Sequence, residues 1–242
     1  VLGFAFDAAG NMIAADANGA LISIAPDGGI VRLVDQVDGS DLLYPDAVAI
    51  AANGRIYFTD ASMRFSAKQY GPGLANLLDM FEQSATGRII EFDPETRGTR
   101  IVARGLGFPN GLVMSEDQSS LFVAETARYR IWRISLAAQD LDVNQPSAQA
   151  TILLDNLPGF PDNLMRGLEG RIWVGFPAPR APALDEASPF MRKLALRLPA
   201  SFMPAPVRLG RVMAFTDRLY LHHIDELPGI PWMEASRLKT LE

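Results

Sequence analysis

The chain has 242 residues, of which 48% are hydrophobic, and a formal net charge of −6. A nucleic-acid binder needs a basic surface to release counterions from phosphates, so this charge argues against nucleic acid as a partner. There are no cysteines, which excludes disulfides, thiolate metal sites and cysteine nucleophiles. No stretch approaches the roughly 18 apolar residues that a membrane-spanning helix needs.

A short pattern recurs along the chain: a turn residue, then a run rich in β-branched and aromatic residues that ends on a polar or small residue. The copies start at Gly10, Gly54, Ser119, Gly170 and Asp217. They are 44, 65, 51 and 47 residues apart, and a base period in the forties is typical of a four-stranded propeller blade. The longer intervals indicate insertions.

Further strand-like segments surround these runs. Four precede a run, at 1–6, 45–50, 109–114 and 161–166. Outer pairs follow two of the runs, at 20–24 with 30–34 and at 87–92 with 100–103. Period-two alternation between Gly, Pro and Asp turns predicts antiparallel strands. The sequence therefore predicts an all-β fold, a single β-propeller domain over residues 1–242 with about five blades visible.

Two segments interrupt this rhythm, at about 62–86 and 177–209. They contain helix-forming stretches around 74–82 and 190–198. Both segments follow the second strand of a repeat and so leave from the same face of the propeller. We expect them to fold over that face as partly helical lids, a common way to exclude water from a site.

The repeat also looks interrupted near its last copy. A third strand is predicted at 211–215, but Thr216 then runs straight into the fifth repeat at Asp217. Because a propeller closes by pairing its first and last strands, we expect residues to be absent at this junction and before Val1.

Polar residues stand at the two strand ends that meet at one face. In each antiparallel pair, the start of the inner strand lies beside the end of the second strand. The inner-strand starts carry Asp46, Asn110, Asp162 and Asn163. The second-strand ends carry Asp60, Glu125 and the pair His222 and His223. We expect these side chains to surround one mouth of the central channel.

The composition of this ring predicts a metal-assisted reaction on a small-molecule substrate. Carboxylate and amide oxygens suit Ca²⁺ or another hard divalent cation. Such an ion polarises the carbonyl of an ester or lactone. His222 or His223 is the candidate general base, because an imidazole titrates near neutral pH.

Structural interpretations of the same residues remain open. Asp or Asn after a proline is also ordinary turn chemistry. Asp60 and Glu125 at strand ends are equally suited to accepting backbone N–H groups. The two histidines are adjacent on a strand and point to opposite sides, so at most one of them faces the channel.

Four stretches, at 54–62, 107–112, 123–126 and 157–163, together resemble strictosidine-synthase-like proteins, a group related to the paraoxonase and gluconolactonase (SMP-30-like) propellers. The resemblance implies six blades, one of them mostly outside this chain. It also implies that Asn110, Asp162 and Asn163 hold a catalytic calcium. A further asparagine ligand of that family falls on Pro45, with Asp46 beside it.

The resemblance leaves two other functions open. One is the condensation of an amine with an aldehyde, for which the family's glutamate base falls between Thr216 and Asp217. The other is a non-catalytic propeller that binds a ligand or partner. A membrane anchor, present in some of these relatives, is expected only before Val1. The compartment, cytoplasmic or periplasmic, and the oligomeric state stay open.

Overall fold

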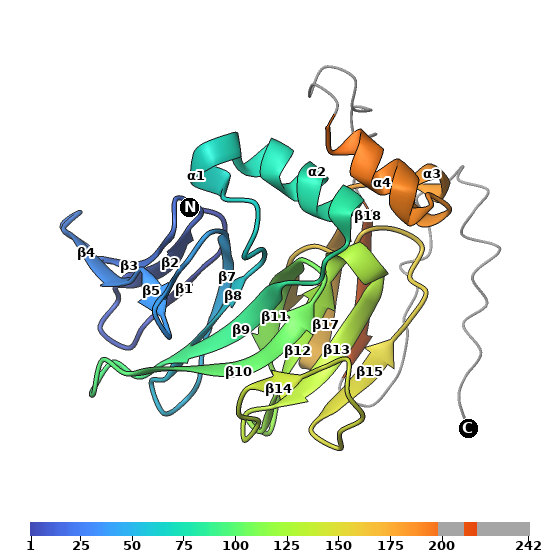
Figure 1. Cartoon of the computed structure of the whole chain (residues 1–242). Coiled ribbons are helices and arrows are strands. Elements are labelled where there is room, and N and C mark those ends of the chain that lie inside the picture. The colour runs from blue at the N-terminus through green and yellow to red at the C-terminus, as the bar shows by residue number, and fades with distance from the viewer. Residues whose placement is uncertain (198–210, 217–242) are drawn as a thin grey trace.

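The computed structural model describes residues 1–197 and 211–216 and has an all-β, propeller-type arrangement (Figure 1). Antiparallel sheets stand side by side, and in each of them the first strand along the chain lies at one edge. The first sheet contains β1 (Phe4–Phe6), β2 (Met12–Asp16), β3 (Ala20–Ile24) and β4 (Ile30–Val34). The second contains β7 (Pro45–Ile50), β8 (Ile56–Asp60), β9 (Gly87–Phe92) and β10 (Thr99–Leu106), with β14 (Leu141–Asp142) added in parallel at its outer edge.

Two more sheets continue the series. The third contains β11 (Pro109–Met114), β12 (Ser120–Glu125), β13 (Arg130–Ser135) and β15 (Ala150–Leu154). The fourth contains β16 (Leu164–Arg166), β17 (Arg171–Phe176) and β18 (Arg211–Thr216). A small hairpin, β5 (Gln36–Val37) with β6 (Ser40–Asp41), joins the first two sheets, and single 3₁₀ turns occupy Thr126–Arg128 and Leu168–Gly170.

The predicted all-β fold and its strand pattern are confirmed. The strand predicted at 211–215 pairs with β17 as the third strand of the fourth sheet. The inner strand predicted at 161–166 is shorter and begins at Leu164. Pro161 has no N–H, and the N–H of Asp162 and the carbonyl of Asn163 both bond to Gly175 of the next strand rather than forming a regular ladder. The fifth repeat lies in 217–242, outside the described residues, so the blade count of six stays a prediction.

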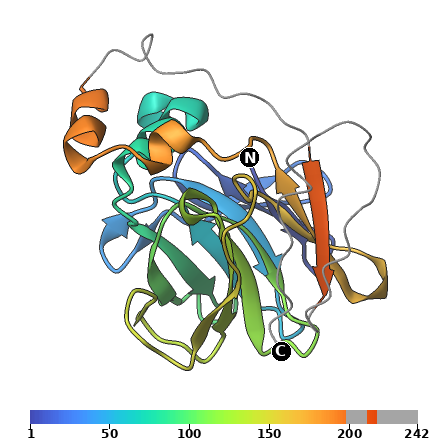
Figure 2. The same ribbon diagram turned by 90° about the vertical axis from the view of Figure 1, so that its right-hand side faces the viewer.

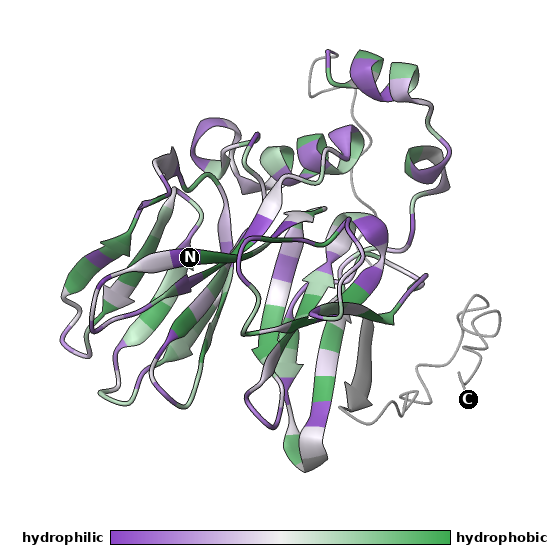
Figure 3. Ribbon diagram, turned by 60° about the horizontal axis from the view of Figure 1, so that its bottom comes forward, coloured by the Kyte–Doolittle hydropathy of each residue, from purple (hydrophilic) through white to green (hydrophobic). Residues whose placement is uncertain are grey.

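The core lies between the sheets rather than within a single one. The first and second sheets bury a cluster around Leu21, Phe58 and Phe92. The third and fourth bury another around Ile131 and Val174. Figure 3 shows the hydrophobic residues concentrated on the strands and the hydrophilic ones on the loops between them. Burial of apolar area between neighbouring blades is therefore what sets their stacking.

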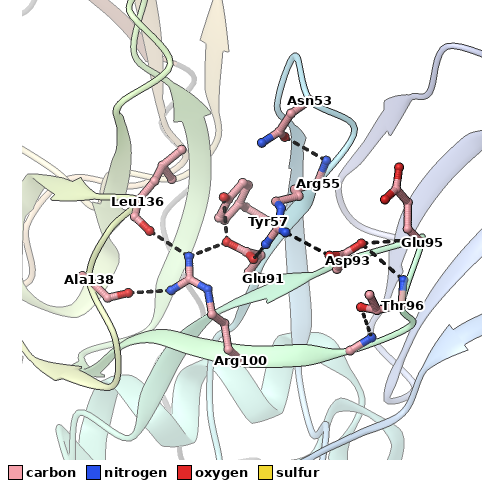
Figure 4. Close-up of polar contacts among 11 residues, drawn as sticks. Asn53, Arg55, Tyr57, Glu91, Asp93, Glu95, Thr96, Arg100, Leu136 and Ala138 are labelled. Atoms are coloured by element: carbon pink, nitrogen blue, oxygen red, sulfur yellow. Dashed lines mark hydrogen bonds and ion pairs between the residues drawn. The ribbon is translucent and has the colours of Figure 1, made fainter.

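The second sheet also carries a buried ion-pair network (Figure 4). Glu91 on β9 pairs with Arg55 and Arg100 and accepts a hydrogen bond from the Tyr57 hydroxyl at 2.7 Å. Arg100 also donates to backbone carbonyls of Leu136 and Ala138, at 2.7 and 2.6 Å. Burial alone raises the pKa of Glu91, but the bonds from Arg100, Tyr57 and Arg55 bring it below its usual value. The network ties the second blade to the third.

The two predicted insertions are helical and lie on the same side of the sheets in both views (Figures 1 and 2). The first contains α1 (Ala67–Tyr70) and α2 (Pro72–Glu82), with Pro72 at the favoured first position of its helix. The second contains α3 (Pro182–Asp185) and α4 (Pro189–Ala195), and α4 contacts α2. Among the described residues, no helix has the length and apolarity needed to cross a membrane.

Candidate functional site

The site begins where the inner strands of neighbouring blades meet. The backbone N–H of Gly111, on β11, donates to the carbonyl of Asp162 at 3.2 Å across the blade boundary. A Cβ on Gly111 would lie only 2.6 Å from that carbonyl oxygen, so a glycine is needed for this approach. Asp162 is thereby held against the inner strand that carries Asn110.

Thr59 makes the equivalent connection between the second and third blades. Its buried hydroxyl accepts from the backbone N–H of Ala47 at 3.0 Å and donates to the carbonyl of Asn110 at 3.0 Å. Ala47 directly follows Asp46 on β7. One hydroxyl thus fixes the relative position of the strand starts that carry Asp46 and Asn110.

Asp46 is a buried acid without a cation beside it. It is 5% exposed, and no side-chain hydrogen bond or ion pair to it is present in the described part of the chain. Burial raises its pKa well above the usual value, and the nearby charge of Asp162 raises it further. The two carboxylates therefore lie close enough to repel each other.

Asn110 and Asp162 complete the centre of the site. Burial raises the pKa of Asp162, and hydrogen bonding from the Asn110 side chain and the Asn163 backbone offsets this only partly. The Oδ1 atom of Asn110 is buried and has no hydrogen-bond partner within residues 1–197 and 211–216. A buried amide oxygen without a partner is costly unless something else, such as a cation or a water, satisfies it.

The structure brings together Asp46, Asn110 and Asp162, but it places the side chain of Asn163 differently. Asn163 is exposed, and its carbonyl accepts from the backbone N–H of Gly175 at 3.1 Å. Successive residues of an extended segment point to opposite sides, which accounts for the difference between Asp162 and Asn163. The predicted general bases, His222 and His223, lie outside the described residues.

Asp60 and Glu125, the second-strand ends, have the structural role that one interpretation of the sequence allowed. Asp60 accepts from the backbone N–H groups of Leu43 and Tyr44, at 3.2 and 2.8 Å, and pairs with Arg88 at 3.1 Å. Burial raises its pKa more than Arg88 lowers it.

Glu125 is satisfied in the same way. It accepts from the backbone N–H of Gly107 at 2.7 Å and from Nε1 of Trp132 at 2.6 Å. Both acids hold loops in place beside the mouth, and neither is free to bind a ligand there.

Tyr44 is a residue of the site that the sequence analysis did not identify. It is buried, and its hydroxyl donates to the carbonyl of Pro72 at 3.0 Å, at the start of α2. Burial raises its pKa, and the charges of Asp46, Asp162 and Asp79 raise it further. Tyr44 therefore stands between the acids of the mouth and the lid helix.

A sequence signal for Tyr44 exists. An aromatic residue precedes the proline at three inner-strand starts, as Tyr44, Phe108 and Phe160. All three belong to one apolar cluster with residues of both lids, and the rings of Tyr44 and Phe108 meet edge to face at 5.0 Å. The polar mouth is thus covered by an aromatic layer that the two lids complete.

The side-chain oxygens of Asp46, Asn110 and Asp162 fit a hard divalent cation. The part of the chain that the structure describes contains no group of three or more His, Asp or Glu side chains with metal-binding geometry. Asp46, Asn110 and Asp162 supply two carboxylates and one amide oxygen, which is the ligand chemistry of Ca²⁺ rather than Zn²⁺. The buried Oδ1 of Asn110 without a partner is the observation that favours such an ion.

Comparison with known proteins supports the resemblance seen in the sequence. The strictosidine synthase family model matches residues 46–139. The chain is 35% identical to a strictosidine synthase-like protein of Arabidopsis thaliana, over 78% of this chain and 45% of the relative. It is 30% identical to the human adipocyte plasma membrane-associated protein, over 78% of this chain and 45% of the relative. The chain spans about half the length of these curated relatives.

A solved structure resembles the fold. A gluconolactonase from Xanthomonas campestris matches with a TM-score of 0.57 at 22% identity, over 73% of this chain and 56% of that chain. At this identity the match shows the propeller-type fold alone. The protein therefore has a propeller-type fold and is similar to strictosidine-synthase-like proteins, as the stretches quoted from its sequence predicted.

Proposed function

We propose that this protein is a calcium-type, metal-dependent hydrolase of a lactone or ester, with its site at the propeller mouth. The observation that carries the proposal is the buried, unpartnered Oδ1 of Asn110 beside the carboxylates of Asp46 and Asp162. A bound cation would supply Lewis acidity for the substrate carbonyl. The family resemblance, together with a gluconolactonase of similar fold, supports a hydrolytic reaction.

Each residue of the proposed site has a defined role. Asp46, Asn110 and Asp162 would hold the ion, and the exposed side chain of Asn163 lies outside this set. The aromatic layer of Tyr44 and Phe108 excludes water from the site and offers an apolar surface to an uncharged substrate. One of His222 and His223 takes a proton from the attacking water.

The first test is the metal content of the purified protein, with its Tm followed as calcium is removed and returned. We expect roughly one calcium per chain and a fall in Tm of about 5 °C on chelation, because an ion that binds only the folded state stabilises it. Asp162→Asn should abolish the response, and Asp155→Asn, at an exposed acid, should preserve it. A panel of lactones and esters then measures hydrolysis.

Absence of calcium and an unchanged Tm would contradict this proposal. The uncompensated carboxylates of Asp46 and Asp162 also suit a protonated amine, which favours the amine–aldehyde condensation as the second candidate. Binding of an aromatic amine to the chelated protein, lost in Asp162→Asn, would support that reaction. Activity on neither panel would favour a ligand- or partner-binding propeller.

A further inference from the structure

The lid helix α2 contains a second buried acid that the proposed reaction does not use. Asp79 is 1% exposed, and neither of its carboxylate oxygens has a hydrogen-bond partner in the part of the chain that the structure describes. Its neighbours Ala75, Leu78 and Met80 are also buried, so the carboxyl lies on the face of α2 that is packed against the protein. An ionised carboxylate in such surroundings carries a large desolvation cost.

Among the described residues, the charged groups around α2 leave Asp79 largely uncompensated. On its own helix, Glu82 adds a like charge that raises the pKa of Asp79. Arg64 from the preceding loop pairs with Glu82 at 2.9 Å, and its charge lowers the pKa of Asp79 by less than Glu82 raises it. On α4, Arg192 donates through Nε and Nη2 to the carbonyls of Ala187 and Leu184, at 2.9 and 2.8 Å, and is not directed at Asp79.

The remaining groups near α2 do not help either. On α1, Lys68 is exposed. Below the helix, Tyr44 is uncharged, and Asp46 and Asp162 beyond it are acids. The Ser62 hydroxyl lies near Asp79 and lowers its pKa, but it carries no charge and its contact with the carboxylate falls short of hydrogen-bond geometry.

Because α2 covers the mouth, the protonation state of Asp79 bears on whether the mouth is open. The helix covers the mouth and is attached to it through the bond from the Tyr44 hydroxyl to the carbonyl of Pro72 at 3.0 Å. Undocking the helix would expose Asp79 to water and uncover the aromatic layer of Tyr44 and Phe108. Protonation of one carboxyl and closure of the mouth are therefore coupled through the same packed face.

We propose that α2 is a pH-responsive lid, docked over the mouth when Asp79 is protonated and released when Asp79 ionises. The direction follows from linkage. Burial raises the pKa of docked Asp79 from 3.8 to about 6, against a smaller opposing effect of Ser62. The stabilisation of the docked helix is complete below pH 3.8 and is lost as the pH rises through about 6.

The test is amide hydrogen exchange of the whole protein between pH 4.5 and 7.5, corrected for the intrinsic effect of pH on exchange. We expect the protection of α2 to fall by about 25-fold across this range, because part of the effect of a shift of about two pH units already falls below pH 4.5. Strands β9 and β12 should keep constant protection. Asp79→Asn should make α2 protection independent of pH, and Asp79→Glu should restore the dependence.

Constant protection of α2 in the wild-type protein would overturn the proposal, as would an unchanged pH dependence in Asp79→Asn. A loss of protection in β9 and β12 parallel to that in α2 would also overturn it, because it would show global rather than lid opening. The wild-type comparison of α2 with these strands decides the outcome even if a variant fails to fold. The measurement needs no substrate and no metal, so it is independent of the proposed hydrolysis.

Discussion

Glu91 and Asp46 are both almost fully buried, at 3% and 5% exposure, yet the chain treats them in opposite ways. Glu91 is surrounded by Arg55, Arg100 and Tyr57, and its pKa is lowered. Asp46 has another acid as its neighbour and no cation, and its pKa is raised. The carboxylate of Glu91 is thus neutralised by arginines where two blades are joined, whereas that of Asp46, at the mouth where we propose the ligand site, has no such compensation among the described residues.

The largest effect is expected from breaking the ion-pair network around Glu91. Glu91→Ala removes the carboxylate that two arginines share, and we expect a loss of about 3 kcal/mol in the free energy of unfolding. The value is at the low end for a buried pair because Arg55 and Arg100 are 42% and 32% exposed. Denaturant unfolding measures it. Asp35→Ala, which breaks an exposed pair with Arg32, is the control and should cost less than about 1 kcal/mol.

The second prediction concerns the Thr59 hydroxyl, which links the strand starts that carry Asp46 and Asn110. Thr59→Val keeps the shape of the side chain but leaves the N–H of Ala47 and the carbonyl of Asn110 unpartnered, so we expect a loss of about 2 kcal/mol. Thr151→Val, at an exposed position of β15, should change stability by less than about 0.5 kcal/mol. Equal effects of the two substitutions would show that the bridging hydroxyl contributes nothing.

The third prediction has the opposite sign. In the chelated protein at pH 7, Asp46→Asn removes a buried acid whose ionisation is opposed by burial and by the charge of Asp162, so we expect a gain of about 1 kcal/mol. The same variant should lose the rise in Tm on adding calcium. Asp155→Asn should show neither change. A destabilised, calcium-responsive Asp46→Asn would mean that this carboxylate is already satisfied in the metal-free protein.

The smallest expected effect is the pH dependence of the stability change that each substitution causes, a few tenths of a kcal/mol per pH unit, and its sign should differ between Asp46 and Glu91. The raised pKa of Asp46 means that its contribution to stability is present below 3.8 and is lost as the pH rises, so the gain from Asp46→Asn should shrink toward pH 4. The lowered pKa of Glu91 means that its contribution is present above 4.5 and is lost as the pH falls. Slopes of the same sign for Asp46→Asn and Glu91→Gln in chelated protein would contradict the contrast.

The strands could be predicted because their signal is local. Runs such as 54–60 alternate in hydrophobicity and begin at a turn glycine, and this pattern sets strand position with little help from the rest of the chain. Strand β14 could not be predicted, since two residues carry no periodicity and its pairing with β10 depends on a neighbouring blade. The helix at 74–82 was predictable as a helix.

The candidate site was predictable only in part. Repetition of a proline followed by Asp or Asn located Asp46, Asn110 and Asp162, because equivalent positions of a repeat meet at one mouth. Burial was not predictable: a single acid in an amphipathic helix, such as Asp79, looks the same whether it faces water or the core. The exposure of Asn163 next to the part-buried Asp162 could have been anticipated, because successive residues of an extended chain alternate in direction.

The close approach at Gly111 has a mechanical consequence. Asp46, Asn110 and Asp162 come from three successive blades, far apart along the chain, and each blade boundary is crossed by few backbone bonds. A ligand held by all three would act as a removable cross-link, closing long loops of the chain in the way that a disulfide does. The fraction of protein with this ligand bound would then determine how much force is needed to separate one blade from the next.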